Sequence, residues 1–147
     1  MNTELMLEEL DELSKNKEEN LRQIEMINDE IDDCQKKSRQ YALMIFTNNH
    51  NIELYRNKSI ILKKTIKPKL TRLIYIANEK IKIVLLEKEN QRLETNRVYY
   101  QNRIISYQEE KKELENENIS LGNRIFIIND TLNNNENQEK KLIKEAK

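Results

Sequence analysis

The chain has 147 residues, of which 35% are charged and 5% aromatic, with one glycine, one proline and no tryptophan. Tight turns take their unusual backbone angles largely from glycine and proline, so this composition argues against a compact sandwich or α/β domain. It predicts an all-α protein whose long helices form an extended coiled coil. The net charge of zero is unevenly spread: residues 1–33 hold twelve acidic against three basic residues, residues 34–78 hold ten basic against one acidic, and residues 79–147 hold thirteen of each.

Residues 1–46 are predicted to form an acidic coiled-coil helix. In a coiled coil, apolar side chains repeat every seven residues at positions a and d, which form the seam that faces the partner helix. With Leu10 at position a, nine of the fourteen a and d positions from Thr3 to Asn48 are apolar. The predicted seam residues here are Leu10, Leu13, Ile24, Ile27 and Ile31. Cys34 follows at a d position and is interpreted as a small buried apolar residue rather than a reactive thiol.

The stretch TNNHN at residues 47–51 has two interpretations. Asparagine tolerates left-handed backbone angles and competes for backbone hydrogen bonds, which favours a loop. Against a loop, Ile45 and Ile52 lie seven residues apart and keep the helical register. Residues 52–67 are then predicted to form a basic helical segment.

Pro68 marks a predicted break or sharp kink at residues 65–69. Proline costs about 3 kcal/mol inside a helix but is tolerated in a first turn, where Thr65 would serve as the N-cap. The a and d positions of the two halves also differ by a shift of three residues, which falls between Ile66 and Leu86. Such a shift is either a stammer within one helix or the junction of two helices.

Residues 68–130 are predicted to form a long C-terminal coiled-coil helix, followed by a polar tail at residues 131–147. Apolar residues occupy every d position from Leu86 to Ile128, while position a alternates between apolar and polar. The predicted seam residues of this helix are Leu86, Asn90, Leu93, Arg97, Tyr100, Ile104, Tyr107, Lys111, Leu114, Asn118, Leu121, Ile125 and Ile128.

Polar residues within this seam bear on the partner. Asn90 and Asn118 at position a, with leucine common at d, are typical of parallel two-stranded coils. In a parallel homodimer Arg97 and Lys111 would each face their own copy, so a heteromeric coiled coil is favoured over a homodimer. A hairpin between the basic middle and the acidic first segment stays open, although most of that segment's acids fall outside its own seam.

Between Glu53 and Glu79 lie seven cations and no acid. Such a cluster predicts contact with an acidic protein partner or, as the alternative, sequence-independent contact with nucleic-acid phosphates. The predicted contact residues are Arg56, Lys58, Lys63, Lys64, Lys67, Lys69 and Arg72. Residues 41–86 are also richer in apolar side chains than a two-stranded seam needs, which indicates packing of three or more helices or a further docking partner.

No phosphate-binding glycine loop, zinc spacing or nucleophile–base set is visible in the sequence, so we expect neither an enzyme nor a cofactor, metal or small-molecule substrate. The acidic start lacks the pattern of a secretory signal, and no apolar run is long enough to cross a membrane. A cytoplasmic or nuclear protein is therefore expected. The heptad pattern of the sequence resembles that of small all-helical subunits of eukaryotic kinetochore, spindle-pole, axonemal or tethering complexes. The resemblance implies a structural, cytoskeleton-type interaction subunit of a larger heteromeric assembly. The alternative is a nucleic-acid-binding coiled-coil protein.

Overall fold

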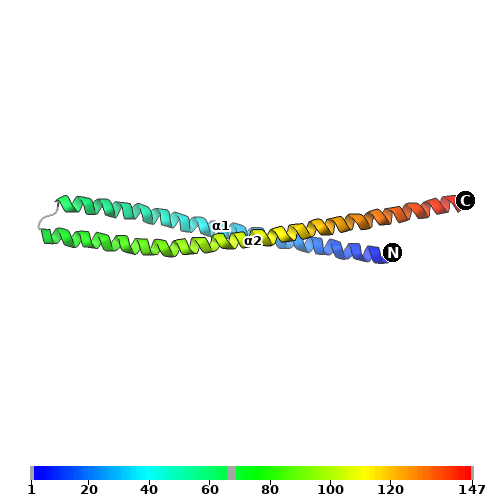
Figure 1. The fold of residues 1–147 in the computed structure, drawn as a ribbon, viewed down its shortest axis with the longest axis horizontal. Coiled ribbons are helices and arrows are strands. Elements are labelled where there is room, and N and C mark those ends of the chain that lie inside the picture. Colours follow the sequence, from blue (N-terminus) through cyan, green and yellow to red (C-terminus); the bar gives the residue numbers. More distant parts are fainter. Residues whose placement is uncertain (1, 66–68, 147) are drawn as a thin grey trace. The chain divides into compact units, whose positions relative to one another are not determined.

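The computed structural model describes residues 2–65 and 69–146. Two α-helices account for nearly all of them: α1, Thr3–Thr65, and α2, Lys69–Ala146 (Figure 1). The described residues contain no strand. The prediction of an all-α protein built from long helices packed against each other is confirmed.

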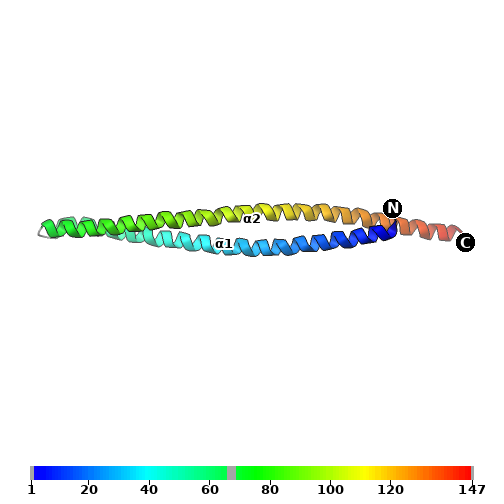
Figure 2. The same ribbon diagram turned by 90° about the horizontal axis from the view of Figure 1, so that it is seen from below.

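The chain divides into two compact units. Unit 1 comprises Met1–Glu30 and Ser106–Lys147, and unit 2 comprises Ile31–Ile105. In unit 2 the two helices lie side by side in both views and run in opposite directions (Figures 1 and 2). In unit 1 an early part of α1 contacts a late part of α2, which is again an antiparallel pairing.

Capping contacts explain where α1 begins. The side-chain oxygen of Asn2 accepts a hydrogen bond from the backbone N–H of Glu4 at 3.0 Å, as an N-cap residue does. The acidic Glu4 in the first turn is also favourable beside the positive end of the helix dipole. The Asn2 bond satisfies a backbone donor that the helix itself leaves unpaired.

At the other end of α1, Lys63 and Lys64 lie in the last turn, where cations are favourable beside the negative end of the dipole. Arg72, in the first turn of α2, donates a hydrogen bond to the backbone carbonyl of Lys63 at 3.0 Å. This bond satisfies a carbonyl that the helix end would leave free. It also ties the end of α1 to the start of α2.

The a and d positions define the buried sides of both helices. In α1 every one of them from Met6 to Leu62 is buried or half-buried, and in α2 every one from Arg72 to Asn135 is likewise covered. The seam therefore changes register between Leu62 and Arg72, where one helix ends and the other begins. The shift of three residues separates two helices and is not a stammer in one. Pro68 itself lies outside the described residues, as does the side chain of Thr65.

The predicted loop at 47–51 is wrong, because α1 continues through it. Thr47 donates its hydroxyl to the carbonyl of Leu43 at 3.0 Å, a helical i to i−4 bond. Asn48 lies half-buried in the seam, and Asn49 accepts a hydrogen bond from Asn90 of α2. Asn49 thus finds a partner across the helix pair, whereas the buried Nδ2 of Asn48 has no hydrogen-bond partner, so packing in the seam and the Asn49 bond together offset the local preference for a loop.

The polar tail predicted at 131–147 also differs from the structure, since α2 continues to Ala146. Thr131 donates its hydroxyl to the carbonyl of Ile127 at 2.9 Å, and Leu132 and Asn135 are half-buried. The seam therefore extends one further turn beyond the predicted helix end. After it, glutamate, lysine and glutamine supply good helix propensity.

Candidate partner-docking surface

The seam of unit 1 is held by polar contacts as well as apolar ones. Asn20 donates a hydrogen bond from Nδ2 to Oδ1 of Asn118 at 3.0 Å, and both residues are buried. The Nδ2 atom of Asn118 in turn points to the carbonyl of Lys17 at 3.4 Å. At the edge of the seam, Arg124 donates to Glu9 at 3.0 Å. A buried amide pair of this kind penalises other alignments of the two helices.

The seam of unit 2 contains an aromatic stack. Tyr41 of α1 and Tyr100 of α2 lie with their ring centroids 5.8 Å apart and their planes 16° apart, and the Lys37 ammonium lies over the Tyr100 ring. Nearer the junction of the helices, Asn90 donates a hydrogen bond from Nδ2 to Oδ1 of Asn49 at 2.9 Å. Tyr100, at a d position of α2, thus meets an aromatic ring of the other helix of its own chain.

Ion pairs join the two helices toward the end of unit 2 near residues 56–82. Arg56 contacts Glu87 at 3.2 Å, and Lys58 contacts Glu79 at 3.4 Å. Lys82 contacts the same Glu79 carboxylate at 3.5 Å and lies over the Tyr55 ring. Glu79 is only 3% exposed, so its charge is largely hidden from solvent and compensated by two lysines.

The parallel arrangement that Asn90 and Asn118 indicated is wrong for the pairing observed here. Each asparagine bonds to an asparagine of the antiparallel helix in its own chain rather than to a copy of itself. Asn20, at a d position of α1, supplies the complementary amide for Asn118. The residues at positions a and d of one helix do not reveal which residues face them.

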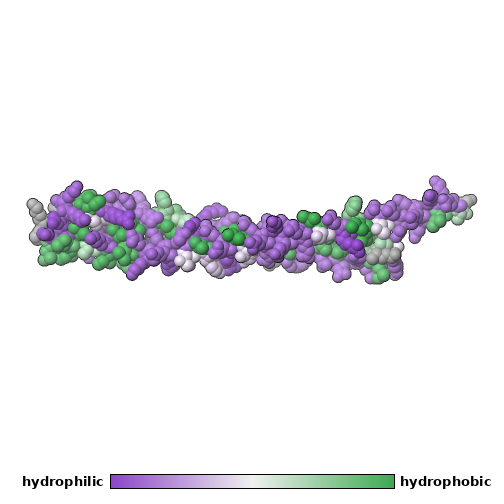
Figure 3. Space-filling model, in the orientation of Figure 1, coloured by the Kyte–Doolittle hydropathy of each residue, from purple (hydrophilic) through white to green (hydrophobic). Residues whose placement is uncertain are grey.

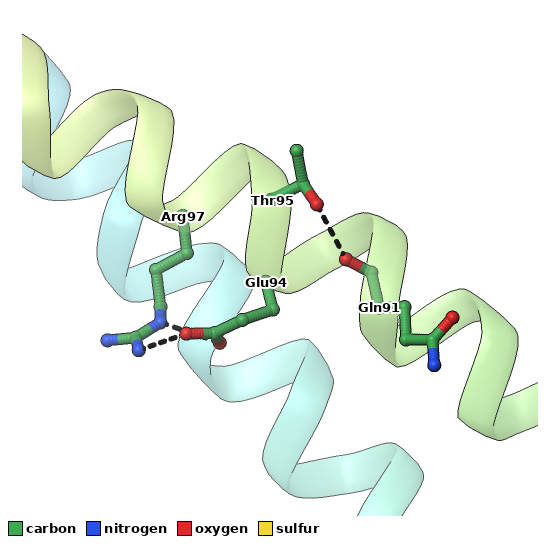
Figure 4. Close-up of polar contacts among 4 residues, drawn as sticks. All are labelled: Gln91, Glu94, Thr95 and Arg97. Carbon is green, nitrogen blue, oxygen red and sulfur yellow. Dashed lines mark hydrogen bonds and ion pairs between the residues drawn. The ribbon is translucent and has the colours of Figure 1, made fainter.

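Arg97 and Lys111 were predicted to conflict with their own copies, and this argument for a heteromer fails. Arg97 instead donates from Nε to Glu94 at 3.0 Å, and a second bond joins its Nη2 to the same carboxylate (Figure 4). Lys111 lies 3.9 Å from Glu115, one turn along α2. In Figure 4 the Arg97 and Glu94 side chains point toward each other, whereas Thr95 bonds back to the carbonyl of Gln91. Both cations are compensated on their own helix.

Acidification should weaken the Glu94–Arg97 pair. Hydrogen bonding to Arg97 holds the pKa of Glu94 below its ordinary value of 4.5. Because the folded pKa is the lower one, the stabilisation is complete above the unfolded pKa and is lost as the pH falls through the folded pKa. Glu94→Gln should therefore reduce the loss of stability between neutral and acid pH, measured by urea unfolding at each pH. The effect should be small because both side chains are partly exposed. Glu117→Gln is the control, and equal pH profiles for Glu94→Gln and the parent protein would contradict the expectation.

The most distinctive surface of the chain lies on the side of α2 opposite its seam. We define the outer stripe as Leu70, Ile74, Ala77, Ile81, Val84 and Leu85. All six are exposed, with Leu70 at 70%, Ile74 at 55% and Ile81 at 57%. Leu73 and Tyr75 beside the stripe are also about half exposed. This part of α2 is therefore apolar on its outer side as well as along much of its seam, which is typical of a helix with neighbours on more than one side.

Exposed apolar residues also lie on the part of α1 that belongs to unit 2. Leu43, Met44, Phe46, Leu54 and Ile60 are all at least half exposed, and all belong to unit 2. Figure 3 shows apolar side chains gathered over the part of unit 2 that holds the end of α1 and the start of α2. Large exposed apolar patches mark interaction sites more often than free surfaces.

The seven predicted cationic contact residues have different surroundings. Arg56 and Lys58 pair with acids of α2, and Arg72 bonds to the Lys63 carbonyl. Lys63, Lys64 and Lys69 are exposed, and no acidic partner is found for them among residues 2–65 and 69–146. Lys67 lies outside the described residues. The structure therefore places six of the seven toward the junction of the helices, and four of those six have no acidic partner among the described residues.

The eighteen predicted seam residues are all buried or half-buried, and each lies in the pairing of α1 with α2. The sequence did not single out Asn20, Asn49 and Glu79 as contact residues. Their positions in the heptads could have revealed Asn20 and Glu79, because both occupy d. Asn49 lies at a flanking position, and nothing in the sequence distinguishes it.

Other kinds of site find no support in the described part of the chain. It contains no group of three or more histidine, cysteine, aspartate or glutamate side chains that could hold a metal ion. None of its helices has a stretch apolar and long enough to cross a membrane. Cys34 is buried in the seam with a free thiol. The pockets of the described part of the chain are open grooves along the helices, such as one of about 390 Å³ lined by Leu7, Leu10 and Leu132.

Comparison of the chain with protein-family models, curated proteins and solved structures found no match. The exposed surfaces of the chain are therefore its main indication of function.

Proposed function

We propose that this chain is a non-enzymatic interaction subunit of a larger heteromeric assembly of helices. Its seam is covered by its own second helix, so the chain needs no partner to bury positions a and d. What still requires cover is the apolar exterior of unit 2, above all the outer stripe. That exposed stripe is the observation that carries the proposal.

The energetics favour a partner at this surface. Complete burial of a leucine or isoleucine side chain is worth about 1.5–3 kcal/mol. Several such side chains are exposed within five turns of α2, while the helix pair that displays them gains nothing from their exposure. A helix that faced only α1 would place polar residues at these outward positions. The composition of the stripe therefore fits a helix that has neighbours on more than one side.

We propose a class of assembly from the same features. Long helices that expose docking surfaces are typical of kinetochore, spindle-pole, axonemal and tethering complexes, and we place the chain in this class of structural proteins, with coiled-coil packing between subunits. A reducing cytoplasmic or nuclear setting fits a chain whose lone cysteine is buried as a thiol.

Nucleic-acid binding is the second candidate function. It is favoured by Lys63, Lys64 and Lys69, whose exposed ammonium groups lack acidic partners in the described residues. Three such groups would give weak, strongly salt-dependent affinity. The adjoining apolar surface is not explained by phosphate contacts, which makes this the lesser proposal.

The test is purification of the untagged chain from its source at near-physiological salt, followed by native mass measurement. We expect a complex heavier than the 17.8 kDa chain that contains at least one other polypeptide. A monodisperse monomer or homodimer would contradict the proposal.

Nucleic-acid binding is tested separately with Lys63→Ser, Lys64→Ser and Lys69→Ser combined. Under the lesser proposal, DNA affinity falls in this variant and its dependence on salt becomes shallower. Under the main proposal, the purified chain has no DNA affinity to lose, and the triple variant still enters the complex.

A further inference from the structure

We infer that the outer stripe of α2 binds an acidic amphipathic helix of a different chain. This inference rests on the proposed function and adds to it the place of contact, the form of the partner and its charge.

The spacing of the outer stripe specifies the form of the partner. Leu70, Ile74, Ala77, Ile81 and Val84 follow one another at intervals of four, three, four and three residues. This alternation is the heptad pattern, and it runs parallel to the seam on the opposite side of the same helix. A second heptad seam accepts the side chains of another helix in the holes between its own. At 1.5 Å per residue, it offers about 22 Å of contact, or roughly two heptads of a partner helix.

The charges around the outer stripe specify the partner's sign. From residue 54 to residue 86, Glu79 is the single acidic residue of the sequence. Its carboxylate is buried and bound by Lys58 and Lys82, so it offers no charge to an approaching helix. Lys80 lies beside the stripe and Lys88 continues it by one turn; both are exposed, and neither has an acidic partner among the described residues. The exposed acids next to Lys88 are already paired, Glu87 with Arg56 and Glu89 with Arg92. A helix lying here meets cations, so glutamate or aspartate at its flanking positions is favoured.

Neither the outer stripe nor the acidic part of α1 in a second copy of this chain fits this description. Two outer stripes facing each other would bring their lysines together. The acidic part of α1 in another copy has the right charge, but its outward large apolar residues are Leu5, Leu7, Leu21 and Met26. These residues do not repeat at intervals of three and four, so they cannot fill a heptad seam. A nucleic acid would leave the isoleucines and leucines of the stripe uncovered.

Site-specific photocrosslinking tests the inference directly. A photoreactive amino acid is placed at Ile81 in the full chain, in its native cells, and the crosslinked peptide is identified by mass spectrometry. The control is the same residue at Asn116, which is exposed at the equivalent heptad position in unit 1. We expect crosslinks from position 81 to an acidic segment of another protein with a three–four apolar repeat, and none to that segment from position 116.

Substitutions give an independent readout. Ile74→Ser combined with Ile81→Ser should reduce recovery of the partner at least about tenfold, the effect of 1.4 kcal/mol or more. Ile119→Ser, an exposed isoleucine of α2 in unit 1, should leave recovery unchanged. Circular dichroism must show that both variants retain their helices, which is expected because the replaced side chains face outward.

The outcomes separate this inference from the proposed function. A crosslink from position 81 to a second copy, to a basic segment or to nucleic acid would overturn the inference. So would a complex that survives the Ile74→Ser and Ile81→Ser changes, although a heteromeric complex would then still support the proposed function. A chain that purifies alone would remove both.

Discussion

Replacing Leu93 by alanine should lower the free energy of unfolding by about 2–4 kcal/mol. Leu93 lies at a d position of α2 in unit 2 and is only 1% exposed. Truncating a buried leucine removes its transfer free energy and leaves a cavity that the neighbouring side chains fill incompletely. The change is measured by urea unfolding followed by circular dichroism.

Leu85 provides the matched control, since it lies on the same helix in the same unit and is 61% exposed. Leu85→Ala removes the same atoms from the outer side and should change the stability of the isolated chain by no more than about 0.5 kcal/mol. Equal losses for the two variants would mean that both sides of α2 are covered in the isolated chain. That result would contradict the distinction between the seam and the outer stripe.

Replacing Asn118 by alanine should lower the free energy of unfolding by about 1–3 kcal/mol, because the buried amide of Asn20 loses its acceptor. The double change Asn20→Leu with Asn118→Leu should be neutral or stabilising, since an apolar pair restores packing without unpaired polar groups. It should also loosen the alignment of the helices, because no amide pair then penalises a shifted register.

The alignment can be measured by electron paramagnetic resonance with spin labels at Glu18 and Ser120, both exposed in unit 1. Cys34→Ala removes the native thiol. The parent should give one narrow distance and the double leucine variant a broader distribution. A double leucine variant that is less stable than the Asn118→Ala variant would contradict the assigned role of the amide pair.

The seam was predictable from the sequence because heptad periodicity is a local property of each helix. Leu86, Leu93 and the residues that follow at d show it without reference to any partner. Pro68 and the shift of three residues likewise located the junction to within a few residues of where α1 ends and α2 begins. The excess of apolar residues between 41 and 86 coincides with exposed apolar side chains of unit 2, and the packing of further helices there stays a prediction.

What the sequence could not supply was the identity of the facing helix. Asn90 and Asn118 indicated a parallel partner because positions a and d of one helix carry no record of what lies opposite. The answer depended on Asn49 and Asn20, which are distant in sequence and not distinctive on their own. The loop predicted at 47–51 failed for the same reason, since asparagine disfavours a helix locally but gains a partner across the pair.

The cations illustrate a further limit. In the sequence, Arg56 and Lys58 belong with Lys63, Lys64 and Lys69 as one patch. In the structure, the first two are engaged by Glu87 and Glu79, so the charge available to a partner is smaller than the sequence implies. Lys80 and Lys88, which the sequence did not single out, lie with the outer stripe and gain importance from it.

The central claim is that α1 and α2 of one chain cover each other's seam. Spin labels at Glu53 and Lys88, with Cys34→Ala, test it by distance measurement in unit 2. Both positions are exposed and polar. The account predicts one short distance that persists when labelled chain is diluted with excess unlabelled chain. A distance of about 50 Å, as expected for 35 residues of one unbroken helix, or a short distance that disappears on dilution, would contradict it.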